Sequence, residues 1–130
     1  MKNTLLVTAV VLAGLSSPGL AQDGDPERGK RVFARCQVCH AVGEGAVNKV
    51  GPQLNGAVGR EWAAVEGFNY SPDLVAGGEE GRVWDEETLH AYLENPKQVA
   101  PRGKMAFPGL RSEEERADVI AYMRQFEAEE

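Results

Sequence analysis

Both cysteines of this chain lie at positions 36 and 39, and a histidine, His40, follows the second directly. The stretch reads Cys-Gln-Val-Cys-His, and the only other histidine in the chain is His90. Three chemistries use such a cluster: a redox-active disulfide, a zinc site and the covalent attachment of haem. The helices and loops predicted around the cluster indicate which of these three chemistries the sequence favours.

Helix signals mark four short segments, each opened by a capping residue and two of them by a following proline. The predicted helices run over residues 26–35 with Asp25 as N-cap; over residues 72–76 after Ser71, ending at Gly77 and Gly78; over residues 86–95 after Asp85, ending before Pro96; and over residues 113–126 after Ser112, which forms a capping box with Glu115. No alternating strand pattern and no internal repeat is present. The chain is therefore expected to be an all-α domain.

Long glycine- and proline-containing loops separate these helices, over residues 41–67 and 97–111. Helices this short bury little apolar surface in so small a chain, and the loops need a surface to pack against. A buried cofactor would supply the missing core.

Covalent haem fits the cysteine cluster better than the two alternatives. A thioredoxin-like redox pair needs a strand and a helix around it, and no strand is predicted. Structural zinc takes four Cys or His ligands, and only His90 is left to complete a set with the cluster. In a haem site, Cys36 and Cys39 add to the two vinyl groups, and His40 supplies one axial nitrogen to the iron.

A low-spin haem iron needs a sixth ligand, and the sequence offers few candidates. Met123 lies on the apolar face of the last predicted helix and is expected in the core. His90 is predicted on the water-exposed side of its helix. Met105, in the irregular loop "PRGKMAFPG", has no periodic reason to be there, and a thioether ligand raises the reduction potential. Met105 is the expected sixth ligand.

The first 21 residues are typical of a cleavable secretory signal. Lys2 forms a short basic region, an apolar run follows from Leu5 to Leu15, and "PGLA" precedes Gln22. An uncleaved anchor is the alternative, but the apolar run is shorter than the roughly 18–20 residues that span a bilayer. We expect a single mature domain over residues 22–130, exported to the periplasm and without stable membrane insertion.

The charge balance of this mature chain argues against nucleic acid as a partner. Removing Lys2 with the signal leaves 13 basic and 20 acidic residues, a formal net charge of −7. A chain of that charge is not attracted to nucleic acid or to anionic membranes in general.

The mature chain resembles the class I cytochromes c, most closely the soluble c2-type and mitochondrial-like electron carriers of alphaproteobacteria. The likeness runs through "GDPERGKRVFARCQVCH", "KVGPQLNGAVGR", "GFNYS", "WDEETLHAYLENP", "GKMAF" and "ADVIAYMRQF". It implies an all-helical fold of about four to five short helices and long loops wrapped around one haem c.

The resemblance also implies roles for residues outside the cysteine cluster. Gly29 and Phe33 of the first helix should cross Tyr122 of the last. The Pro52 carbonyl should accept a hydrogen bond from the His40 ring and fix it. The remaining roles concern the buried faces of the haem: Tyr92 should hydrogen-bond the methionine sulfur, and Arg60, Tyr70 and Trp84 should hold a buried haem propionate.

The implied function is outer-sphere electron transfer by a monomeric carrier that is not an enzyme. The donor would be a quinol-oxidising cytochrome bc complex, and the acceptor a photosynthetic reaction centre, a terminal oxidase or a periplasmic reductase. A five-coordinate haem that acts as a peroxidase or gas sensor stays open as an alternative.

A basic docking face is expected around the haem edge, although the total charge is negative. Its members lie next to the haem-bearing segments, while the acidic runs fall elsewhere in the sequence; they are Arg35, Lys49, Lys97, Arg102 and Lys104. Such a face would steer the chain towards acidic partners and weaken with salt. The alternative is that these charges are scattered and merely solvated.

Overall fold

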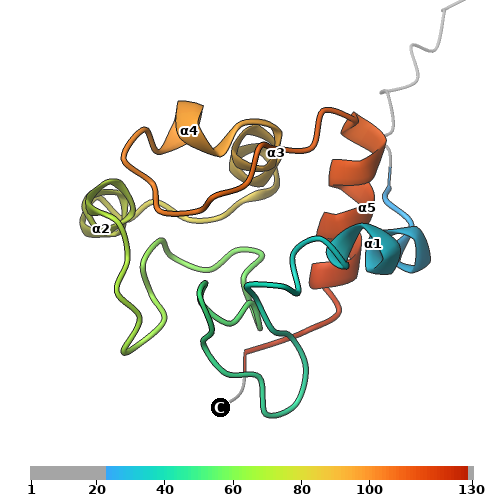
Figure 1. The fold of residues 1–130 in the computed structure, drawn as a ribbon, viewed down its shortest axis with the longest axis horizontal. Helices are drawn as coiled ribbons and strands as arrows, with labels where there is room; N and C mark the ends of the chain where they lie inside the picture. Colours follow the sequence, from blue (N-terminus) through green and yellow to red (C-terminus); the bar gives the residue numbers. More distant parts are fainter. Residues whose placement is uncertain (1–22, 129–130) are drawn as a thin grey trace, which may run out of the picture.

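The computed structural model describes residues 23–128, which form five helices joined by long irregular segments. The helices are α1 (Pro26–Phe33), α2 (Pro72–Glu79), α3 (Glu86–Glu94), α4 (Pro96–Val99) and α5 (Glu113–Met123). Extended pairing in this range is limited to one antiparallel bridge between Glu61 and Val83. Figure 1 shows α1 against α5 on one side of the molecule, α2 on the opposite side, and the loop between α1 and α2 along the lower edge. The all-α prediction is confirmed.

The helix starts follow the capping signals closely. The Asp25 carboxylate accepts from the amides of Glu27 and Arg28, and the Asp85 carboxylate accepts from the amide of Thr88. The capping box at α5 is only half formed. Ser112 Oγ accepts from the Glu115 amide at 3.2 Å, but the Glu115 carboxylate pairs with Arg35 on the other side of the crossing.

The ends of α1 and α5 fall two and three residues earlier than predicted. After Phe33 the amides of Arg35 and Cys36 bond to carbonyls three residues back, with Cys36 N 2.7 Å from Phe33 O. This tighter winding continues as a series of turns through Cys39. The cysteine cluster therefore lies in a turn and not at the end of a helix. The last helix ends at Met123, and Phe126 lies beyond it.

The prediction that Gly77 and Gly78 stop their helix was wrong, because α2 continues through both to Glu79. Both glycines pack against Trp62. A Cβ on Gly77 would lie 2.1 Å from Trp62 Cε3, and a Cβ on Gly78 would lie 2.5 Å from Trp62 O. Glycine is needed at these positions for close packing, which the sequence pattern does not distinguish from a helix stop.

Two further expectations differ from the structure. Residues 97–111 were expected to form a loop, but the segment opens with α4, since Pro96 ends α3 and also occupies the first turn of the next helix. His90 was expected in water, but it is half-buried, and Arg116 Nε lies 3.4 Å from its Nδ1. The reason is that α3 packs against α5 as well as against the core.

The crossing of α1 and α5 places the start of the cysteine turn. A Cβ on Gly29 would lie 1.9 Å from Asp118 O and 2.8 Å from Tyr122 Cβ, so only glycine allows this approach. The rings of Phe33 and Tyr122 pack with centroids 5.3 Å apart. The crossing of Gly29 and Phe33 with Tyr122 is thus confirmed.

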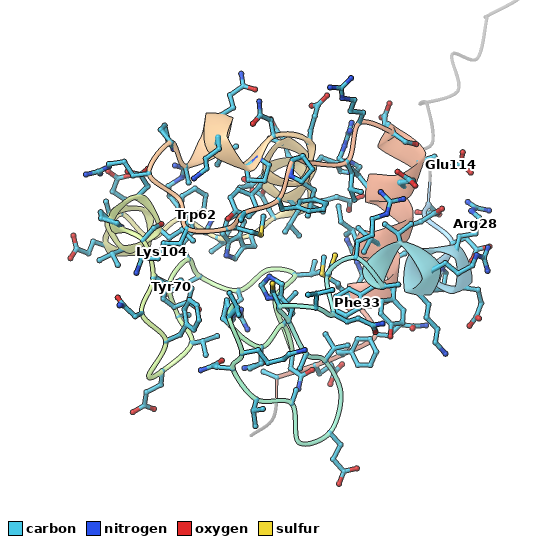
Figure 2. All side chains as sticks on the ribbon, viewed as in Figure 1. Arg28, Phe33, Trp62, Tyr70, Lys104 and Glu114 are labelled. Atoms are coloured by element: carbon cyan, nitrogen blue, oxygen red, sulfur yellow. The ribbon has the colours of Figure 1, made fainter. Side chains whose placement is uncertain are left out.

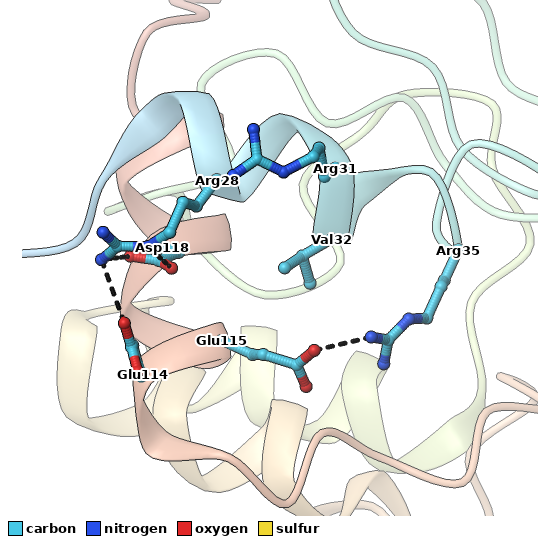
Figure 3. Close-up of a pocket in the computed structure, with 7 residues that line it drawn as sticks. All are labelled: Arg28, Arg31, Val32, Arg35, Glu114, Glu115 and Asp118. Carbon is cyan, nitrogen blue, oxygen red and sulfur yellow. Dashed lines mark hydrogen bonds and ion pairs between the residues drawn. The ribbon is translucent and has the colours of Figure 1, made fainter.

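A buried carboxylate fastens the same crossing. Asp118, whose side chain is 3% exposed, accepts from Arg28 Nε at 2.7 Å, from Arg28 Nη2 at 2.9 Å and from the Asp25 amide at 2.7 Å. Figure 3 shows Arg28 reaching across to Asp118 and Glu114, with Arg35 paired to Glu115 further along. The hydrogen bond from Arg28 lowers the pKa of Asp118 below its usual range.

We predict that Gly29→Ala destabilises the fold by about 2 kcal/mol, because the new methyl group overpacks the crossing and outweighs the gain in helix propensity. Urea unfolding of the purified protein measures the loss. Lys30→Ala, on the exposed side of the same helix, is the control and should leave the midpoint nearly unchanged. Equal midpoints for the two variants would contradict the role given to the crossing.

Candidate functional site

The cysteine cluster forms one tight turn directly after α1. The amides of Cys39 and His40 both bond to the Cys36 carbonyl, at 3.0 and 2.9 Å. Both thiols are free and half-buried. Burial raises the pKa of the Cys36 thiol, and the nearby Arg35 opposes this. The turn thus presents two unpaired sulfurs and one imidazole on a short stretch of backbone.

The His40 ring is fixed on two sides by the loop that follows. Its Nδ1 lies 2.7 Å from the Pro52 carbonyl, so a neutral ring donates here and keeps its Nε2 lone pair free. Gly51 lies flat against the ring, because a Cβ there would stand 2.4 Å from His40 Cε1. Burial lowers the pKa of His40, which favours the neutral, metal-binding form.

The antiparallel bridge brings Arg60 and Trp84 side by side. Trp84 N bonds to Arg60 O at 2.8 Å, and Trp62 N bonds to Arg82 O at 2.9 Å. The Arg60 guanidinium donates to the carbonyls of Asn55 and Gln53, at 2.9 and 3.2 Å. Its Nε is buried with no partner in the described residues, and burial lowers the pKa of the group.

Tyr70 and Ser71 lie directly before α2, and the hydroxyl group of each can form a further hydrogen bond. The Tyr70 hydroxyl accepts from the Val65 amide at 3.1 Å, which leaves its own proton to donate. Burial raises the pKa of Tyr70. Ser71 occupies the N-cap position, but its hydroxyl makes no capping bond and is buried without a partner among residues 23–128. A carboxylate would satisfy such donors, because a buried anion is tolerated only when it is hydrogen-bonded.

Trp62, Trp84 and Tyr92 form a continuous aromatic stack. Trp62 and Trp84 are 4.5 Å apart between centroids and nearly parallel, and Trp84 and Tyr92 are 4.7 Å apart. Burial raises the pKa of Tyr92, and its hydroxyl forms no hydrogen bond within the part of the chain that the structure describes. A bond from Tyr92 to the Met105 sulfur therefore stays a prediction.

Met105 is half-buried in the irregular segment between α4 and α5, whereas Met123 is 5% exposed in the core, as expected. The end of the Met105 segment is fixed against α3, with Leu110 N 2.7 Å from Leu93 O. Gly109 allows this, since a Cβ there would lie 2.0 Å from Glu94 O.

Many large apolar side chains next to the core are only partly covered. They come from every part of the chain: Cys36, Val42, Leu54, Val58, Leu74, Tyr92, Leu93, Val99, Phe107 and Tyr122. A flat apolar ring system that carries carboxylates would offer apolar surface to side chains of this kind and partners to the unsatisfied donors at Arg60 and Ser71. The residues present therefore fit a haem.

The five expected docking residues are all exposed, but each has a partner. Arg35 pairs with Glu115 and Arg102 with Asp73, both at 2.6 Å, so acidic groups are not confined to the other side of the molecule. The three lysines donate to backbone carbonyls: Lys49 to Gln37, Lys97 to Gly103 and Lys104 to Asn69.

Sequence reasoning missed three residues that shape the site. Gly51 packs on the imidazole, Asn55 holds Gly43 through both its amide atoms at 2.8 Å, and Trp62 is 2% exposed beneath Trp84. A tryptophan inside a loop was the available signal for Trp62, because a large aromatic residue is rarely left in water. Gly51 and Asn55 have no such signal.

An all-α chain that holds two cysteines and a fixed histidine ring in one Cys-x-x-Cys-His turn belongs to a class of protein that attaches haem covalently. A family model described as Cytochrome c matches residues 26–127. The chain belongs to the cytochrome c family.

Its relatives and structural neighbours agree with this assignment. Cytochrome c-550 of Ancylobacter novellus is 50% identical over 104 residues, which cover 80% of this chain and 97% of that protein. Cytochrome c2 of Blastochloris viridis is 44% identical over 119 residues, covering 92% and 90%. The structure of cytochrome c2 from Rhodospirillum centenum superposes with a TM-score of 0.74 at 40% identity, covering 81% of this chain and 100% of that one. The fold is that of the class I cytochromes c.

The family carries electrons on one haem c, held here through Cys36 and Cys39. Among residues 23–128, no three His, Cys, Asp or Glu side chains converge as a separate metal site.

We predict that Gly51→Ala pushes the His40 ring off the Pro52 carbonyl and destabilises the protein by about 1–3 kcal/mol. Thermal unfolding of the haem-loaded protein measures the stability, and the ferric proton NMR shifts of the imidazole report the ring orientation. The control is Val50→Ala, at a neighbouring side chain that is 81% exposed. An unchanged ring orientation in Gly51→Ala would rule out this packing role.

Proposed function

We propose that the protein is a periplasmic one-electron carrier in which His40 and Met105 are the axial ligands of the haem iron. The observation that carries the proposal is the His40 ring, fixed by the Pro52 carbonyl at 2.7 Å so that Nε2 is free to bind a metal. The relatives named cytochrome c2 support the same class of function. As a carrier, the protein makes and breaks no substrate bond.

The haem supplies a one-electron couple, Fe(III)/Fe(II), and the chain sets its properties. His40 gives a strong nitrogen ligand whose orientation the Pro52 carbonyl holds. Met105 would give a soft thioether that favours the ferrous state, and we propose that the Tyr92 hydroxyl donates a hydrogen bond to it. If His40 and Met105 both stay bound in each oxidation state, little rearrangement of the chain would oppose electron transfer.

Arg60, Tyr70 and Trp84 are the residues we propose for the buried propionate. The Arg60 guanidinium is half-buried without a carboxylate partner in the described residues, and the Tyr70 hydroxyl has a proton to donate. A charged carboxylate held by these groups costs less to bury than a free one. By pairing with the propionate, the Arg60 guanidinium would offset a negative charge of the haem, which would favour the reduced state.

The proposed route begins at a quinol-oxidising cytochrome bc complex. The electron then passes to a reaction centre, a terminal oxidase or a periplasmic reductase.

We propose residues 1–21, which lie outside the described residues, as the cleaved export signal. None of the helices in residues 23–128 is long and apolar enough to cross a membrane.

The axial ligand is tested first, with Met105→Ala and the core variant Met123→Leu as its matched control. We expect Met105→Ala to lose the weak near-infrared ferric charge-transfer band of iron–thioether ligation. Its reduction potential should fall by on the order of 0.1 V. Met123→Leu should keep both properties, since it exchanges one core side chain for another of similar size.

A wild-type protein that lacks the band and binds carbon monoxide or cyanide freely would overturn the carrier assignment. Peroxidase and gas-binding assays would then become the relevant measurements. A band that survives Met105→Ala but not Met123→Leu would move the axial role to the core methionine.

We propose a docking face centred on Lys49, near the cysteine turn. Lys49 Nζ donates to the Gln37 carbonyl, and two valines beside it are largely exposed, Val38 at 73% and Val50 at 81%. Apolar side chains next to a positive charge suit a short-lived complex with an acidic protein surface. The opposite charges attract the partner, and contact between apolar side chains then stabilises the complex.

We predict that Lys49→Glu slows reduction by a cytochrome bc complex about tenfold at low ionic strength and flattens the dependence of the rate on salt. Stopped-flow reduction over a range of salt concentrations measures both. Arg124→Glu makes the same charge change at the end of α5, where Arg124 pairs with Glu86. Equal slowing in both variants would mean that only the total charge matters.

A further inference from the structure

The segment that carries Met105 has little regular structure of its own to hold it. It runs from α4 past α2 and back to α5 as an irregular loop, coloured orange in Figure 1. At its start, Gly103 N bonds to Ala100 O at 2.8 Å, and at its end Leu110 N bonds to Leu93 O. Between these two bonds, side chains and not backbone pairing tie the segment to its neighbours.

The strongest of these ties joins the segment to α2. Asp73, in the first turn of α2, accepts from the Arg102 amide at 2.6 Å and from Arg102 Nε at 2.8 Å, and its Oδ1 lies 2.6 Å from Arg102 Nη2. One carboxylate thus holds both the side chain and the backbone of the same residue. The Asp73 side chain is 17% exposed and the Arg102 side chain 68%, so the carboxylate is largely covered while the guanidinium stays near the surface.

Two lysines add ties on either side of Arg102. Lys104 Nζ donates to the Asn69 carbonyl at 2.9 Å, just before α2, and Lys97 Nζ donates to the Gly103 carbonyl. Figure 2 shows Lys104 close to Tyr70 and to α2. The residues just before Met105 are therefore held against α2, the segment before it and α4.

We propose that Asp73 is a positioning residue that keeps Met105 at the iron by clamping Arg102. This inference rests on the proposed axial role of Met105. The closed arrangement has the Asp73–Arg102 bonds, and the open arrangement, in which the segment has moved away, lacks them. An external ligand can reach the sixth position only in the open arrangement, so its apparent affinity rises in proportion to the open population.

Imidazole binding to the ferric, haem-loaded protein tests the clamp. Imidazole is neutral at about pH 8, so the charge that a variant adds or removes does not bias its binding. We expect Asp73→Ala to tighten imidazole binding about tenfold. Arg102→Gln should tighten it about threefold, because the bond from the Arg102 amide survives in that variant. The double variant should resemble Asp73→Ala, since Asp73→Ala already removes every bond that Arg102→Gln removes.

The matched control is Glu86→Gln. It breaks an exposed ion pair with Arg124, at 2.9 Å between α3 and α5, away from the Met105 segment. Its imidazole affinity should equal that of the wild type. Urea unfolding of every variant separates a local opening from a general loss of stability, because a local clamp changes ligand affinity more than the unfolding midpoint.

Imidazole affinities of Asp73→Ala and Arg102→Gln that match the control would overturn the clamp while leaving the carrier assignment intact. The clamp would also be overturned if the imidazole affinity of Asp73→Ala, Arg102→Gln and the double variant rose only in proportion to their loss of global stability in urea. A wild-type protein without the iron–thioether band would instead overturn the axial role of Met105, on which the clamp depends. The two failures are therefore distinguishable in one set of spectra.

Discussion

The crossing of α1 and α5 is the constraint on which the rest of the structure depends. Gly29 lets the two backbones touch, and Asp118 fastens them through Arg28 and the Asp25 amide. The cysteine turn begins where α1 ends, so the crossing sets the position of Cys36, Cys39 and His40 relative to the last helix. A displacement there would move the anchor of the haem and not merely one helix.

From this anchor, the long loops are held by contacts that suit a cofactor better than a protein core. The Cys39 carbonyl bonds to the Gly51 amide, the Pro52 carbonyl faces the imidazole, and the bridge beside Trp84 positions Arg60. Together these contacts leave apolar side chains only partly buried and leave buried donors such as Arg60 Nε without a partner in the described residues. The haem is therefore part of the packing as well as the redox centre, and its loss should cost stability.

The sequence predicted where α1, α2, α3 and α5 begin and that the chain attaches haem c, but it did not predict α4 or much of the packing. Capping residues such as Asp25 and Asp85 predicted helix starts, because their side chains act on amides two or three residues away. The cysteine turn could be predicted for the same reason, because Cys36, Cys39 and His40 are neighbours in the sequence. Gly77, Gly78 and His90 were misinterpreted because their environment is set by Trp62 and Arg116, which no short-range pattern connects to them. Asn55 was missed for the same reason, since its partner Gly43 lies in the opposite arm of a loop.

The basic residues around the site illustrate a conflict between docking and holding. A partner is attracted by unpaired positive charge, but Arg35 and Arg102 are both neutralised by carboxylates of this chain. Charges that are already paired add little to a long-range field, although they can still hold a segment in place. Arg102 is thus better suited to positioning Met105 than to attracting a partner. The partner of Lys49 is a carbonyl and not a carboxylate, so no acidic group of this chain offsets its charge there. If Lys49 serves docking as proposed, ligand retention and partner recognition can be altered separately.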